Sequence, residues 1–124
     1  MLRVFPVVMI VIAAIGAITP QDSSYRSLLL SPADSALVEF EAGRFWHAAR
    51  MLREEDAAAG KPEDVLLLAR AEAGWGNWSA VAELLDGAEW LPEESGAIGL
   101  YLLGRAWEAR GQWAQAAESY GRYV

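Results

Sequence analysis

Two arginines form the residue pattern with the clearest chemical potential in this chain. Arg70 and Arg105 lie 35 residues apart, and each precedes a glycine, Gly76 or Gly111, by six residues. A guanidinium group presents a planar fork of N–H donors that suits a carboxylate or an acidic peptide segment. If both arginines lie on one face of the fold, nearby polar side chains complete a partner-binding strip. The predicted set is Arg70, Tyr101, Arg105 and Glu108.

Acidic residues close to these arginines give a second interpretation of the same pattern. Glu72 and Glu108 lie within three residues of Arg70 and Arg105, respectively. Ion pairs formed on the surface of an acidic protein contribute little binding chemistry and little stability. The sequence leaves both interpretations open.

Tryptophan is the other unusual feature, with six copies in 124 residues. Trp46, Trp75 and Trp90 fall outside the repeat spacing described below, so we expect them either to stack on an extended or sugar ligand or to pack at edges of the fold. His47 has no nucleophile or metal-ligand pattern around it, and we interpret it as a partly exposed helix residue.

Composition excludes several classes of chemistry. There is no cysteine and only one histidine, which rules out disulfides, thiolate zinc sites, iron–sulfur clusters and multi-histidine metal sites. No phosphate-binding glycine loop and no Ser/His/Asp arrangement occurs, so we expect no cofactor, no metal and no enzyme activity from this chain. A net charge of −7 argues against a nucleic-acid partner.

The N-terminal segment differs from everything that follows it. After Arg3, residues 4–18 contain no charge. This stretch is shorter than the ~20 residues of a spanning helix and fits the apolar region of a secretory signal. Residues 1–19 are therefore predicted to be a signal peptide or a membrane anchor, and residues 20–31 a linker. An exported chain of this kind is expected in the periplasm or cell envelope. Cleavage and retention both remain open.

The rest of the chain contains three copies of one pattern with a period near 34 residues. Each copy has a glycine, an aromatic residue two positions later, and a small residue seven positions before the glycine. Each also has a large residue nine positions after the glycine. The members are Ala36, Gly43, Phe45 and Leu52; Ala69, Gly76, Trp78 and Leu85; and Gly104, Gly111, Trp113 and Tyr120.

This spacing predicts helical hairpins. The glycine ends the first helix with a left-handed backbone, and the aromatic residue starts the apolar stripe of the second helix. The small residue accepts a bulky side chain from the antiparallel helix. No segment predicts a strand. The expected helices are 32–42, 45–58, 62–74, 77–89, 93–110 and 113–123, the fifth beginning with Glu93 and Glu94 at its N-terminus.

The pattern resembles the tetratricopeptide repeat family. The second copy departs from the family motif, with Glu72 at an aromatic position and Val81 at an alanine position. The first copy departs further, with Ser35 and Glu39 at positions that are usually bulky and apolar. The third copy matches best, through Leu103, Gly104, Trp107, Gly111, Trp113, Ala116 and Tyr120.

The resemblance implies an all-α protein: a right-handed α-solenoid of three hairpins over 32–61, 62–92 and 93–124. We expect Trp78, Trp107 and Trp113 to be core residues. No capping helix follows Val124, so the last repeat is expected to be truncated and the chain to continue in its gene; the alternative is a small protein that dimerises through this end. The implied function is a cell-envelope scaffold that binds a peptide or partner domain on its concave face.

A second functional interpretation comes from periplasmic lytic transglycosylases, some of which carry a helical superhelix before their catalytic domain. This chain is similar to such a segment in being Trp-rich and preceded by an export signal. It would then be the non-catalytic N-terminal part of an enzyme that acts on peptidoglycan, with the catalytic glutamate beyond Val124. A third possibility is an assembly factor held at the membrane by residues 4–18.

Overall fold

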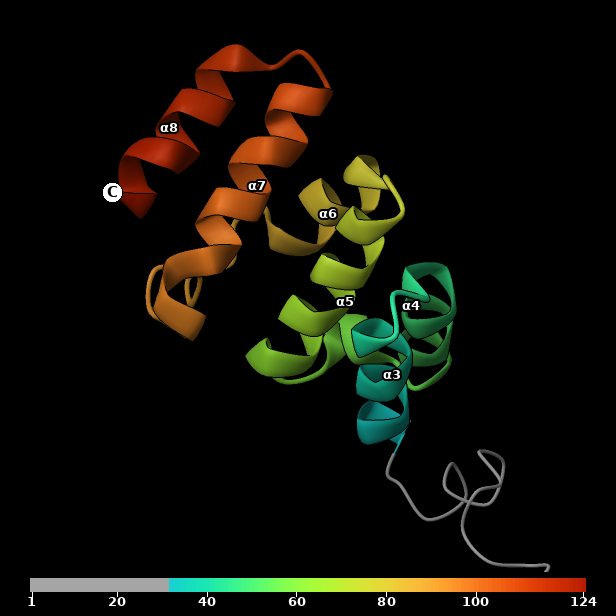
Figure 1. The fold of residues 1–124 in the computed structure, drawn as a ribbon. Helices are drawn as coiled ribbons and strands as arrows, with labels where there is room; N and C mark the ends of the chain where they lie inside the picture. Colours follow the sequence, from blue (N-terminus) through green and yellow to red (C-terminus); the bar gives the residue numbers. More distant parts are fainter. Residues whose placement is uncertain (1–31) are drawn as a thin grey trace, which may run out of the picture. The chain divides into compact units, whose positions relative to one another are not determined.

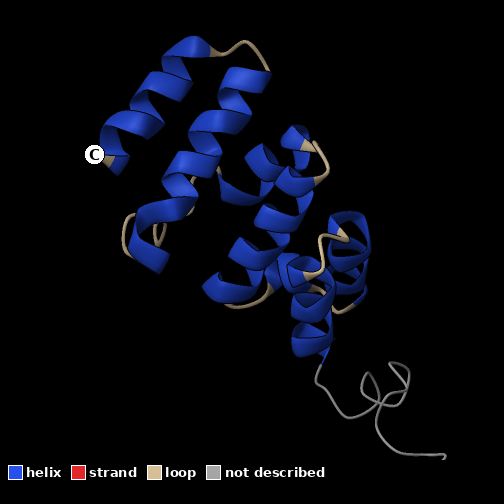
Figure 2. Ribbon diagram, in the orientation of Figure 1, coloured by secondary structure: helices blue, strands red, loops and turns tan. Residues whose placement is uncertain are grey.

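The computed structural model of this chain describes residues 32–124. The signal or anchor predicted over 1–19 and the linker predicted over 20–31 lie outside the described residues. Every regular element within 32–124 is helical, with no strand (Figures 1 and 2). The predicted all-α class is therefore confirmed. No helix in this part of the chain has the length and apolar character needed to cross a membrane.

Six α-helices and two short 3₁₀ segments follow one another along residues 32–124 (Figure 1). Proline opens two of the α-helices, at a position where its missing N–H costs no hydrogen bond. The elements are α3 (Pro32–Glu41), α4 (Phe45–Glu54), η1 (Ala57–Ala59), α5 (Pro62–Gly74), α6 (Trp78–Leu85), η2 (Glu94–Ala97), α7 (Ile98–Ala109) and α8 (Trp113–Tyr123).

The second helix of each of the first two hairpins is shorter than the sequence predicts. Helix α4 ends at Glu54 rather than at residue 58, because Asp56 adopts a left-handed backbone with φ 55°. Helix α6 ends at Leu85 rather than at residue 89, and Gly87 follows with φ 75°. A residue with positive φ cannot continue a right-handed helix.

The start of the fifth predicted helix was placed wrongly. Helix α7 begins at Ile98, five residues after the expected position, since Ser95, Gly96 and Ala97 all have positive φ. Three successive left-handed residues turn the chain sharply before α7. The acids at 93 and 94 therefore do not occupy the N-terminus of α7, and the expected dipole stabilisation there is absent.

The three repeat glycines end the first helices as predicted. Gly43, Gly76 and Gly111 have φ of +82°, +90° and +73°. The residue after each glycine donates its backbone N–H to the carbonyl five positions earlier, which is the longer bond of a Schellman cap. These bonds run from Arg44 to Glu39, from Asn77 to Glu72 and from Gln112 to Trp107, at 2.9, 2.9 and 2.8 Å.

Each helix packs against the next one in the sequence, and the first helices of neighbouring hairpins also touch: α3 contacts α5, and α5 contacts α7. Within the third hairpin, the ring of Tyr120 lies over Gly104, where a side chain would overlap it. The predicted pairing of a small residue with a bulky one is confirmed there. Ala36 and Ala69, at the same position in the other hairpins, are fully buried.

The apolar core consists of two clusters that share α5. Val65 and Ala69 of α5 belong to one cluster, which α6 and α7 complete. Leu68 and Ala71 of α5 belong to the other, which α3 and α4 complete. Helix α5 therefore carries apolar residues on two faces.

The aromatic residues that open the second helices do not share one environment. Phe45 lies against Gly74 of α5, and Trp78 lies beneath the Arg105 guanidinium of α7. In both cases the ring packs on the first helix of the following hairpin. Trp113 is 66% exposed, because no such helix follows α8 among residues 32–124. The prediction that Trp113 is a core residue was therefore wrong; Trp78 and Trp107 are half-buried, and Ala116 is buried.

Candidate functional site

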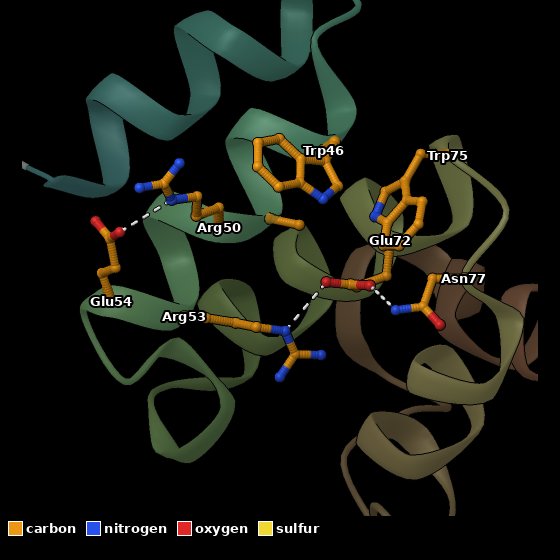
Figure 3. A pocket seen from close by; sticks show the side chains of 8 residues that line it. Trp46, Arg50, Arg53, Glu54, Glu72, Trp75 and Asn77 are labelled. Atoms are coloured by element: carbon orange, nitrogen blue, oxygen red, sulfur yellow. Dashed lines mark hydrogen bonds and ion pairs between the residues drawn. The ribbon is translucent and has the colours of Figure 1, made fainter.

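Two exposed tryptophans border an open cleft between the first and second hairpins (Figure 3). Trp46 lies in the first turn of α4, and Trp75 directly follows α5. These two residues are 49% and 46% exposed. We call this the tryptophan cleft; its volume is about 420 Å³, and it is lined by Trp46, Ala49, Arg50, Arg53, Glu54, Glu72, Trp75 and Asn77.

Glu72 forms the floor of the tryptophan cleft. Only 2% of this residue is exposed, yet both carboxylate oxygens are bonded. Arg53 Nε donates to Oε1 over 3.1 Å, and the Asn77 side-chain amide donates to Oε2. Figure 3 shows the carboxylate lying between Arg53 and Asn77, below the two indoles. A buried carboxylate is tolerated only with such partners, so Glu72 fixes both side chains in place.

The first hairpin repeats part of this arrangement. Glu39 stands at the same repeat position as Glu72, and Arg44 stands at the same position as Asn77. The Arg44 guanidinium pairs with the Glu39 carboxylate, and this bond lowers the pKa of Glu39. In both hairpins, therefore, the residue after the glycine bonds the acid that lies four positions before that glycine. Sequence reasoning flagged these acids as departures and missed their partners.

A second ion pair lies at the rim of the tryptophan cleft. Arg50 Nε and Glu54 Oε1 are 3.3 Å apart, one turn along α4. The Arg50 guanidinium also lies 5.6 Å from the centre of the Trp46 ring. Each arginine of the cleft is thus matched by one carboxylate, and the cleft has no net charge.

A second cleft lies beside α7. We call it the tyrosine cleft; its volume is about 560 Å³, and it is lined by Trp78, Tyr101, Arg105, Glu108, Ala109 and Tyr120. Tyr101, Arg105 and Glu108 come from successive turns of α7, while Tyr120 comes from α8 and Trp78 from α6.

Hydrogen bonds and ring contacts hold the polar groups of the tyrosine cleft. Arg105 Nη1 donates to the Tyr101 hydroxyl over 3.3 Å, and Tyr120 donates its hydroxyl to Glu108 Oε2 over 2.7 Å. Arg105 also lies 5.5 Å from the centre of the Trp78 ring and 3.9 Å from Glu108. The bond with Tyr101 raises the pKa of Arg105, so this side chain remains a cation.

Tyr120 has the most perturbed phenol among the described residues. Burial, followed by the hydrogen bond to Glu108, raises the pKa of Tyr120 to about 12 from the usual 10.0. Both effects favour the neutral phenol, since ionisation would place a second negative charge beside Glu108.

Alkaline unfolding should report this shift. Because the pKa of Tyr120 is raised by folding, its contribution to stability is complete below about pH 10 and is lost between about pH 10 and 12. The Tyr120→Phe chain should therefore lose less unfolding free energy than the parent across that interval. Urea titrations at several pH values measure both slopes; equal slopes would contradict the assignment.

The predicted partner-binding strip is brought together in part. Tyr101, Arg105 and Glu108 share the tyrosine cleft. Arg70 lies elsewhere on α5, with its guanidinium 4.9 Å from the centre of the Phe40 ring of α3. Of the alternative ion pairs, Glu108 lies near Arg105, whereas Glu72 pairs with Arg53 instead of Arg70.

The off-motif tryptophans lie in two different surroundings, and only the edge packing expected as one alternative is seen, at Trp90. Trp46 and Trp75 meet at one cleft, whereas Trp90 is half-buried and packs against the core. His47 is exposed, with its ring centre 5.4 Å from that of Trp46. Arg53 and Asn77 carried no sequence signal, because their role depends on the fold bringing them to Glu72.

Residues 32–124 contain no cluster of acidic and histidine side chains suited to a metal ion. Comparisons of the chain with protein-family profiles, with curated proteins and with solved structures found no match. We therefore infer its function from the geometry of its own side chains.

Proposed function

We propose that residues 32–124 form a tetratricopeptide-like solenoid that binds an extended peptide segment of a partner protein in the tyrosine cleft. The observation that carries this proposal is the presence of a fixed cation, a fixed carboxylate and three aromatic rings in that one cleft. The export signal and cell-envelope location predicted from residues 1–19 belong to the same proposal.

The chemistry of a peptide backbone matches the groups in the tyrosine cleft. A backbone offers carbonyl acceptors and N–H donors in alternation. Arg105 and the Tyr101 hydroxyl hydrogen supply donors, and Glu108 supplies acceptors. The rings of Trp78 and Tyr120 provide apolar surface for an adjacent side chain, and rigid aromatic anchors of this kind dominate binding energy at many interfaces.

The packing of the helices supports the solenoid part of the proposal. First helices contact first helices, and each hairpin closes on a glycine with positive φ. Stacked units of this kind cannot bury their apolar faces alone and present a continuous surface made of first helices. Tyr101, Arg105 and Glu108 all belong to such a helix, α7.

A displayed library of random dodecapeptides tests the proposal. Arg105→Ala should weaken the binding of selected peptides by roughly tenfold or more, because a charge-assisted hydrogen bond is worth ~1.5–3 kcal/mol. The affinity of this variant should also depend less on salt. Arg70→Ala is the matched control, since Arg70 occupies the same repeat position outside the tyrosine cleft. Unchanged affinity of Arg105→Ala by titration calorimetry would refute the role of the tyrosine cleft.

A further inference from the structure

The tryptophan cleft is a separate candidate for binding, and its chemistry differs from that of the tyrosine cleft. We propose that the tryptophan cleft is a second binding site, besides the peptide site in the tyrosine cleft, and that it binds a neutral saccharide built from glucose-configured pyranose rings. Such a ring has an apolar face of axial C–H groups and an edge of equatorial hydroxyls. The cleft offers a complement to each of these features.

The first feature that favours a sugar is the exposed aromatic surface. Trp46 and Trp75 are each nearly half exposed to solvent, although large aromatic side chains dominate the apolar cores of proteins. Both side chains border the same cleft rather than scattering over the surface (Figure 3). Indole faces placed in this way suit the flat C–H face of a pyranose.

The second feature is the absence of net charge. Arg50 is matched by Glu54, and Arg53 is matched by Glu72. A cationic ligand would find no uncompensated carboxylate, because Glu54 and Glu72 each already pair with an arginine of the cleft. An anionic ligand would be repelled by the net charge of −7 on the chain. A neutral ligand meets neither obstacle.

The third feature is a set of hydrogen-bonding groups that are fixed before any ligand arrives. Glu72 holds Arg53 through Nε, and Figure 3 shows the two terminal nitrogens of Arg53 pointing away from Glu72. Glu72 also holds the Asn77 amide nitrogen, and Figure 3 shows the Asn77 amide oxygen pointing away from Glu72. Arg53 and Asn77 both line the cleft, and their remaining N–H donors and amide oxygen match the chemistry of vicinal hydroxyls. Glu72 is a positioning residue in this arrangement.

Titration of the full chain with cellotetraose and with chitotetraose tests the proposal. Binding of either probe should shift the indole N–H resonances of Trp46 and Trp75 and leave that of Trp113 unchanged. Trp46→Ala and Trp75→Ala should each weaken the affinity by at least tenfold. Trp113→Ala is the matched control, because Trp113 is more exposed than either cleft tryptophan but lies on α8, and this variant should retain the parent affinity.

Two further variants separate a sugar site from other outcomes. Glu72→Gln keeps the shape of the side chain, and it should weaken binding of the tetrasaccharide while circular dichroism shows an intact helical fold. Arg105→Ala should leave the sugar affinity unchanged, so the sugar site and the peptide site fail independently. The proposal is overturned if neither tetrasaccharide binds at a concentration of roughly 10 millimolar, which would detect even a weak dissociation constant. It is also overturned if Trp113→Ala loses binding equally, or if peptides selected on the chain shift the Trp46 and Trp75 resonances while sugars do not.

Discussion

Gly104→Ala is expected to lower the unfolding free energy by about 2 kcal/mol. A methyl group at this position would lie 2.6 Å from Cδ1 and 2.9 Å from Cζ of the Tyr120 ring, well inside van der Waals contact. The ring is rigid and is held by its hydroxyl to Glu108, so relief requires α7 and α8 to move apart. Overpacking of this kind costs up to ~3 kcal/mol, and the better helix propensity of alanine offsets ~1 kcal/mol.

Gly121→Ala is the matched control for this prediction. Gly121 also lies within a helix, α8, but no atom approaches its side-chain position within 4 Å. The same substitution should therefore stabilise the chain by about 0.5–1 kcal/mol through helix propensity alone. Urea unfolding followed by circular dichroism measures both variants. If the two changes in free energy have the same sign, Tyr120 does not pack on Gly104 as described.

Removal of the Arg53 guanidinium from the tryptophan cleft is expected to have the largest effect on the unfolding free energy. Arg53→Met leaves the Glu72 carboxylate buried with Asn77 as its remaining partner. Breaking one side of a fully buried ion pair costs ~3–5 kcal/mol; because the Arg53 side chain is 45% exposed and the amide bond remains, this variant falls at the lower end, at ~3 kcal/mol. The unfolding free energy should fall by that amount, with the m-value unchanged.

The double variant Arg53→Met with Glu72→Leu shows whether the loss arises from the stranded charge. Replacing both charges with apolar side chains removes the desolvation cost, and such replacements are often neutral or stabilising. We expect the double variant to return to within about 1 kcal/mol of the parent. A loss in the double variant as large as in Arg53→Met would mean that packing, not charge, accounts for the effect.

The hairpins could be predicted because their signals are local and repeated. Gly43, Gly76 and Gly111 each end a helix, and the fold needs positive φ at each of them. The pairing of Gly104 with Tyr120 follows from positions that recur at fixed distances from those glycines. Antiparallel packing of two adjacent helices then places a small residue against a bulky one without further information.

The segment before α7 could not be predicted for the opposite reason. Ser95 and Ala97 adopt positive φ, which their residue types disfavour. The surrounding packing selects this conformation: Leu91 is 1% exposed and lies over Gly99 of α7. The sequence Pro92-Glu93-Glu94 carries the local signals of a helix start, so tertiary contacts overrode them.

The candidate sites could be predicted only in part, because they depend on contacts between hairpins. Tyr101, Arg105 and Glu108 share one helix, and helical spacing alone places them on neighbouring turns. Arg70 occupies the same repeat position as Arg105, but its guanidinium lies on the Phe40 ring, so the shared repeat position does not place the two arginines in one cleft. Trp113 shares a position with Phe45 yet differs in surroundings, since burial is set by the next helix and not by the residue itself.

Helix α5 has a consequence for cooperativity that follows from its two apolar faces. Val65 and Ala69 are needed by one core cluster, and Leu68 and Ala71 by the other. Neither cluster can open by releasing α5 without exposing the other to water. Local openings within residues 32–124 are therefore expected to begin at α3 and α8, whereas amide protons of α5 should exchange with solvent only through global unfolding.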